Sequence, residues 1–137
     1  MKVVINECFG GFGLSPKAVK LYAEKKGTTI YPAKNIIEND RLTNKLNYCD
    51  WNSDDIFINY VTKELNDDGT IKEGSYFYDG NLERTDKTLI EVVEELGAEA
   101  NGWAAKLKIV EIPDDVDWYI HDHDGLESIY EKHRSWD

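Results

Sequence analysis

The sequence predicts an α+β fold, in which two helices pack on one face of a mixed, largely antiparallel sheet. Two stretches carry apolar residues on one helical face and are bounded by capping residues. Between and after them lie short segments rich in β-branched and aromatic residues, separated by tight turns. No internal repeat or linker divides the chain, so we expect its 137 residues to form a single domain, residues 1–137.

The N-terminal stretch combines a strand, a glycine-rich turn and the start of a helix. Residues 3–5 (Val-Val-Ile) favour a strand. Ser15 suits a helix N-cap, and Pro16 suits the first helical position, where its missing N–H costs nothing. The helix should end at Gly27, a residue typical of helix C-termini. Between the strand and the helix, three glycines interrupt the chain: Gly10, Gly11 and Gly13.

The middle of the chain is harder to interpret. Residues 28–31 are β-prone, and we expect them to lie parallel to residues 3–5 because a helix separates the two segments. Residues 33–55 are rich in Asn, Asp and Lys, which predicts a long ordered loop or a poorly packed excursion. Residues 56–61 favour a strand. Shorter strands are expected to begin at residues 70–71 and 75–78, after a turn at Asp68-Gly69.

The last third of the chain contains clear signals for one helix and three strands. Asp86 is expected to cap a second helix, which runs to Leu96 and ends at Gly97. Alternating apolar and polar residues then predict three strands, at residues 107–112, 118–121 and 126–130, the last two joined by a turn at Asp124-Gly125.

The composition bounds the kind of partner. Twenty-seven acidic against sixteen basic residues give a formal charge of −11, which disfavours direct binding of nucleic acid. An acidic surface suits docking on a basic host protein, or it merely keeps a small protein in solution. No apolar run is long enough to span a membrane, so we expect a cytoplasmic protein without membrane contact. Its two cysteines are expected to be reduced, with no metal or cofactor.

The glycine-rich turn is the first candidate site. Free N–H groups and the positive end of the helix dipole point into such a loop, which favours a phosphate or carboxylate. The expected ligand-binding residues are Gly10, Gly11, Gly13, Ser15 and Lys17. The alternative is a purely structural turn, with Phe9 and Phe12 buried in the core. The string matches neither common phosphate-binding glycine motif, so both interpretations stay open.

Three further groups are candidates. The run from His121 to Asp124 resembles a metal or acid–base site, but its alternation along a strand favours a polar hairpin tip. The C-terminal tail contains Arg and Trp, types enriched at interface hot spots, and either binds a partner or closes the sheet. Its candidate partner-binding residues are His133, Arg134 and Trp136. Finally, three aromatic residues either stack on a base or sugar or pack within the sheet: Trp51, Tyr76 and Tyr78.

Three strings resemble a group of small proteins encoded by tailed phages and prophages. They are residues 1–15 (MKVVINECFGGFGLS), residues 89–118 (ending in EIPDDVDW) and residues 124–136 (DGLESIYEKHRSW). The resemblance carries no assigned catalytic residues. It implies a viral accessory protein that acts on host machinery, either by occupying a host protein's surface or by sequestering a signalling molecule.

Together these observations predict a non-enzymatic phage protein that binds and inhibits a host factor, in counter-defence or host takeover. A first alternative is a sponge that holds a phosphorylated nucleotide signal at the glycine-rich turn. A second alternative is a small hydrolase that uses His121 or His133. No catalytic residue is assigned, and the sequence leaves open whether the chain acts alone or as a homo-oligomer.

Overall fold

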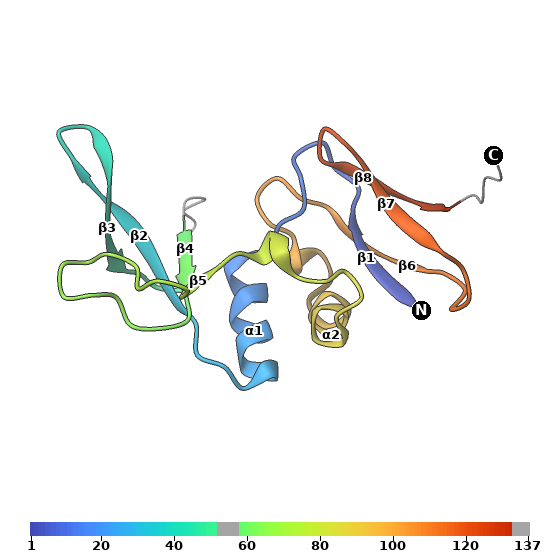
Figure 1. Ribbon diagram of the computed structural model, residues 1–137, viewed down its shortest axis with the longest axis horizontal. Coiled ribbons are helices and arrows are strands. Elements are labelled where there is room, and N and C mark those ends of the chain that lie inside the picture. Colours follow the sequence, from blue (N-terminus) through green and yellow to red (C-terminus); the bar gives the residue numbers. More distant parts are fainter. Residues whose placement is uncertain (52–57, 133–137) are drawn as a thin grey trace.

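The computed structural model describes residues 1–51 and 58–132, and in this part of the chain two helices accompany three separate antiparallel sheets (Figure 1). The α+β class predicted from the sequence is confirmed. The helices lie between two groups of strands, one formed by the middle of the chain and the other by its two ends. One detail of the prediction is wrong: the described strands form three separate sheets rather than one mixed sheet, and every ladder among them is antiparallel.

The first sheet joins the two halves of the chain. Strand β1 (Lys2–Asn6) pairs antiparallel with β6 (Leu107–Glu111), with Val4 opposite Ile109. The expected parallel partner for residues 3–5, residues 28–31, is therefore wrong. Helix α2 (Lys87–Leu96) packs against both strands.

The second sheet has the order β3-β2-β4-β5. Its strands are β2 (Tyr31–Glu38), β3 (Arg41–Tyr48), β4 (Ile58–Val61) and β5 (Tyr76–Phe77). The loop expected over residues 33–55 is therefore wrong for most of its length, since β2 and β3 form a protruding hairpin. Its two-residue turn, Asn39-Asp40, has positive φ at both positions (51° and 60°), as type I′ hairpin turns require. No strand begins at residues 70–71.

The third sheet is the hairpin of β7 (Trp118–His123) and β8 (Leu126–Glu131), which turns at Asp124-Gly125 as predicted. It lies beside β1 and is tied to it by a backbone-to-side-chain hydrogen bond. The Asn6 N–H donates to Glu127 Oε1 over 2.8 Å. The two chain-end sheets thus form one unit.

Both helices begin and end where the sequence predicts. In α1 (Pro16–Lys26) the Ser15 hydroxyl accepts from the Ala18 N–H at 3.1 Å, and Gly27 closes the helix with φ of 70°. Asp86 caps α2 by accepting from the Thr88 N–H at 2.7 Å. The Tyr22 hydroxyl also donates to Asp86 at 2.8 Å, which links the two helices.

One hydrophobic core connects the helices with β1 and β4. Its largest fully buried members are aliphatic: Val4, Val19, Leu89 and Val92. Two short 3-10 turns complete the fold, η1 (Asp79–Asn81) before α2 and η2 (Gly97–Ala100) after it. Neither helix of the described chain has the length and apolarity that crossing a bilayer requires.

Candidate functional site

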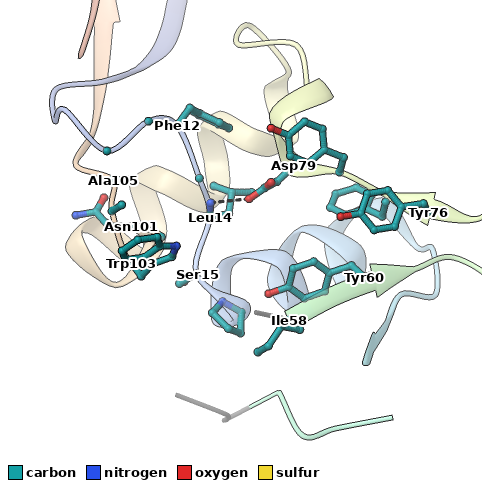
Figure 2. A pocket seen from close by; sticks show the side chains of 18 residues that line it. Phe12, Leu14, Ser15, Ile58, Tyr60, Tyr76, Asp79, Asn101, Trp103 and Ala105 are labelled. Carbon is teal, nitrogen blue, oxygen red and sulfur yellow. Dashed lines mark hydrogen bonds between the residues drawn. The ribbon is translucent and has the colours of Figure 1, made fainter. Parts of the chain in front are cut away.

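An open pocket of about 440 Å³ lies where the glycine loop, residues 10–15, faces strands β4 and β5 (Figure 2). The segment that follows η2 closes its third side. Six aromatic side chains of the described residues line it, and we call it the aromatic pocket: Phe12, Tyr60, Tyr76, Phe77, Tyr78 and Trp103. The pocket therefore draws on segments that are far apart in the sequence.

The inner wall of the aromatic pocket is rigidly packed. Tyr60 is buried and stacks on Trp51, with ring centroids 5.8 Å apart and an interplanar angle of 17°. Tyr60 also packs against Phe77, with ring centroids 6.4 Å apart and an interplanar angle of 84°. Because Tyr60 is held by two neighbouring rings, this wall loses little freedom on binding and is preorganised.

The rim of the pocket is exposed. Trp103 is 77% accessible, and Tyr76 and Tyr78 are each 53% accessible. The Tyr78 ring lies directly over Gly80, where an added Cβ would fall 2.5 Å from a ring carbon. The rim thus places apolar surface in solvent around a partly enclosed interior.

Among the described residues that line the pocket, Asp79 is the single charged side chain. Its Oδ2 accepts from the Leu14 N–H at 2.8 Å, which Figure 2 shows as a dashed line. Burial raises the pKa of Asp79, and the backbone donors and the distant positive charge of Arg84 offset only part of that effect. No cation in the described parts of the chain lies within ion-pair distance of it.

The hydroxyls of Tyr60 and Tyr76 are neutral donors at physiological pH. Burial raises the pKa of Tyr60, and the negative charge of Asp79 raises it further. The same two causes raise the pKa of Tyr76. Figure 2 shows both rings pointing from the strands toward the glycine loop. The pocket can therefore stack a flat group, donate through hydroxyls and accept through one carboxylate.

The glycines of the loop allow backbone to pack against backbone. A Cβ on Gly102 would lie 2.8 Å from the Gly13 carbonyl carbon, and the Gly102 N–H donates to Gly13 O at 2.9 Å. A Cβ on Gly10 would overlap the Ala104 carbonyl oxygen. On the other side, a Cβ on Gly125 would lie 2.5 Å from the Gly11 nitrogen. The loop is thus clamped between the η2–β6 segment and the β7–β8 turn.

The structure brings four of the five predicted ligand-binding residues to the pocket: Gly10, Gly11, Gly13 and Ser15. Lys17 does not line it and instead pairs with Glu99 at 3.2 Å on the surface. Two of the loop donors are already engaged, because Leu14 binds Asp79 and the Ser15 N–H donates to Ala100 O at 3.0 Å. A carboxylate of the chain itself therefore occupies the position in which an anion was expected.

A polar network holds the loop from behind. Arg84 forms an ion pair with Glu127, whose side chain is buried. The Arg84 guanidinium also stacks on the Phe12 ring, 3.7 Å from its centroid. The fully buried Asn6 accepts from the Lys106 N–H at 2.8 Å. The expectation that Phe9 and Phe12 are both in the core is half wrong, because Phe9 is exposed.

The other candidate groups lie away from the pocket. The run from His121 to Asp124 ends the β7–β8 hairpin, where Asp122 Oδ1 accepts from the Gly125 N–H at 2.7 Å. His121 meets the edge of Tyr130 at 5.9 Å. The predicted partner-binding residues lie outside the described residues: His133, Arg134 and Trp136.

Sequence reasoning missed three members of the site, namely Tyr60, Asp79 and Trp103. Tyr76 and Tyr78 had been recognised as candidate stacking residues, and both lie at the rim. The missed signal was local: the string Tyr-Phe-Tyr-Asp at residues 76–79 places a carboxylate directly after three rings. Asp79 is also the first residue of the η1 turn.

The resemblance to phage proteins stays a prediction. The described lining of the pocket combines aromatic side chains with one acidic side chain. Comparisons of this chain with protein-family models, curated proteins and solved structures found no match.

Proposed function

We propose that this is a non-enzymatic binding protein, encoded by a phage or prophage, that inhibits a host protein by docking on it in the host cytoplasm. The observation that carries the proposal is the ring of exposed aromatic side chains around a partly enclosed pocket. Trp and Tyr are the residue types that dominate binding energy at protein interfaces.

The arrangement of the rim supports a macromolecular partner. Exposed apolar surface that gathers in one place marks an interaction site more often than scattered apolar residues do. Trp103, Tyr76 and Tyr78 surround one opening, and the first of these is the most exposed large apolar side chain described.

The charge of the chain supports a basic partner. A formal charge of −11 over 137 residues creates a negative potential that steers positively charged surfaces toward it. Inhibition follows if the covered surface of the host protein is one that it needs for its own substrate or partner.

The test is capture of a host protein with matched aromatic variants. The immobilised protein is exposed to host lysate, alongside Trp103→Ala and Tyr119→Ala. Tyr119 is exposed on β7, stacks on Tyr130 and lies outside the pocket, so its loss removes a comparable ring elsewhere. We expect one protein to be retained by the wild type and by Tyr119→Ala, and at least tenfold less by Trp103→Ala. Equal retention by all three, or no retained protein, contradicts the proposal.

A second candidate function, a sponge for a nucleotide-type signal, is favoured by the same aromatic wall. A base would stack on Trp103, and phosphates would have to rely on those loop N–H groups that Asp79 and Ala100 leave free. The described side chains that line the pocket supply no positive charge. This candidate therefore explains the rings better than it explains the carboxylate.

Thermal-shift measurements with nucleotides and cyclic nucleotides test the sponge directly. A tight ligand raises the melting temperature by mass action. Gly11→Val should abolish such a shift, because Gly11 has φ of 106° and a branched side chain is strained there. A shift that survives this substitution would remove the glycine loop from the binding site.

A further inference from the structure

We propose that the aromatic pocket receives an arginine side chain of the partner, with its guanidinium among the rings and paired to Asp79. This inference rests on the proposed function and names the chemistry by which the partner is recognised. It concerns an interior position of the pocket rather than the exposed rim.

The negative charge of Asp79 favours a cationic group in the pocket. Asp79 is a partly buried carboxylate with no cation of the described chain close enough to pair with it. The nearest positive charge that affects it, Arg84, is committed to Glu127 and Phe12. Burying a carboxylate without a paired cation is unfavourable, so an incoming positive group gains more here than at the exposed surface.

The aromatic rings of the pocket favour arginine over lysine. A guanidinium is planar, stacks on aromatic faces and is more weakly hydrated than an ammonium. The chain itself demonstrates this contact in the neighbouring position, where Arg84 lies 3.7 Å from the centroid of Phe12. The pocket offers Tyr60, Tyr76 and Phe77 as further faces and edges for such a group.

The exposed rim of the pocket favours an arginine of a protein over a free small cation. A small cation inside the pocket would leave Trp103, Tyr76 and Tyr78 largely exposed. A protein surface around the inserted arginine would cover all three, and such rings of aromatic contacts exclude water around a buried hot-spot residue. The overall charge of −11 favours the same class of partner.

The experiment compares two capped tripeptides, Gly-Arg-Gly and Gly-citrulline-Gly, by NMR titration of the 15N-labelled protein. Citrulline has nearly the shape of arginine but no charge, so the pair isolates the charge. We expect the arginine peptide to shift amide resonances of the glycine loop and of residues 77–80 at millimolar concentrations. The citrulline peptide should bind at least tenfold more weakly.

Two variants locate the effect. Asp79→Asn keeps an acceptor for the Leu14 N–H and should remove the preference for arginine over citrulline. Asp115→Asn removes one exposed charge outside the pocket and should leave the preference unchanged. If Asp79→Asn does not fold, the wild type alone still decides. The preference of the wild type for arginine over citrulline should fall as the pH is lowered through the pKa of Asp79. The charged and titratable groups around Asp79 are Arg84, Tyr60 and Tyr76.

The inference is overturned if the two peptides bind equally to the wild type, if Asp79→Asn keeps the preference, or if the pocket resonances do not respond. These outcomes are separable from the proposed function. A host protein whose retention depends on Trp103 while arginine and citrulline peptides bind alike would leave the proposed function standing and refute only the inference. A preference for arginine with no dependence of retention on Trp103 would do the reverse.

Discussion

Asp79 ties the chemistry of the pocket to the pH dependence of folding. Burial raises the pKa of this carboxyl in the folded state, so between its unfolded and its folded pKa the folded chain binds more protons than the unfolded chain. The ionised carboxylate therefore destabilises the fold, and this penalty develops as pH rises through that window and is fully present above it.

Asp79→Asn should remove the penalty. We expect the free energy of unfolding of the variant, relative to wild type, to increase from pH 3 to pH 7, at about 1.4 kcal/mol for each unit by which the pKa is raised. Urea denaturation of both proteins at several pH values measures this difference in the free energy of unfolding. The contributions of all other titrating groups cancel in it. A relative stability that falls as pH rises would show that the carboxylate is stabilised rather than strained by its surroundings.

Glu127 is the residue whose loss should cost most. Its side chain is buried, pairs with Arg84 and accepts from the Asn6 N–H. Glu127→Gln would leave the Arg84 charge without its partner, and we expect a loss of about 3 kcal/mol in the free energy of unfolding.

A half-exposed pair provides the matched control. Lys2 and Glu94 lie 3.1 Å apart at the surface, and Glu94→Gln should cost less than about 1 kcal/mol. Denaturant titrations of the two variants give the comparison. Equal costs would mean that the buried pair is no more important to the fold than a surface contact.

At the level of elements, the glycine loop can be tested by two substitutions of the same size. Gly102→Ala would place a Cβ 2.8 Å from the Gly13 carbonyl carbon, so the loop must shift, and we expect a loss of about 2 kcal/mol. In Gly13→Ala the nearest atom to the new Cβ is Asp79 Oδ2 at 3.9 Å, which is ordinary contact, and the change should stay within about 0.5 kcal/mol. Melting curves decide, and a Gly13→Ala variant as unstable as Gly102→Ala would contradict the clamped-loop description.

The β2–β3 hairpin allows a prediction of opposite signs at one position. Asp40 has φ of 60°, a region in which glycine is unstrained. Asp40→Gly should stabilise the hairpin by about 0.5 kcal/mol, whereas Asp40→Ala should destabilise it by about 1 kcal/mol. Amide hydrogen exchange across the hairpin measures both, and a stabilising alanine would be incompatible with this turn.

The helices could be predicted because their signals are local. Ser15, Pro16 and Asp86 act within one turn of their own positions. The partner of β1 could not be predicted, since β6 follows it about a hundred residues later and no local pattern records that pairing. Strand β3 was missed for a related reason: seven of its eight residues are at least partly exposed, so its composition resembles that of a loop.

At the level of the whole molecule, the net charge predicts opposite effects of salt on folding and on binding. With a charge of −11 the folded chain repels itself. Added NaCl that reduces the Debye length to about 10 Å or less should raise the melting temperature. The same salt should slow association with a basic partner, because it screens the attraction between them.

Thermal melts at increasing NaCl test the first effect, and stopped-flow binding to the captured partner tests the second. Repeating the melts near the isoelectric point provides the control, since the salt dependence should vanish there. A melting temperature that falls with NaCl at pH 7 would mean that the surface ion pairs outweigh the self-repulsion.

The candidate site was only partly predictable because it forms between distant segments. The glycine loop and two rim tyrosines were recognisable as strings, but the buried Tyr60 and the carboxylate of Asp79 become pocket residues only when β4, β5 and η1 fold against residues 10–15. A pattern along one chain records which groups are present, whereas a pocket depends on which of them converge.

Arg84 stacks on Phe12 and forms an ion pair with Glu127, and these two contacts matter for any shortened version of this chain. Glu127 belongs to β8 and is not among the residues that line the pocket. Removing the β7–β8 hairpin to make a smaller reagent would leave the Arg84 guanidinium without its ion-pair partner. Phe12, the pocket residue on which Arg84 stacks, would then lose its support. Epitope tags and truncations are therefore better placed at the β2–β3 tip than at the carboxyl-terminal hairpin.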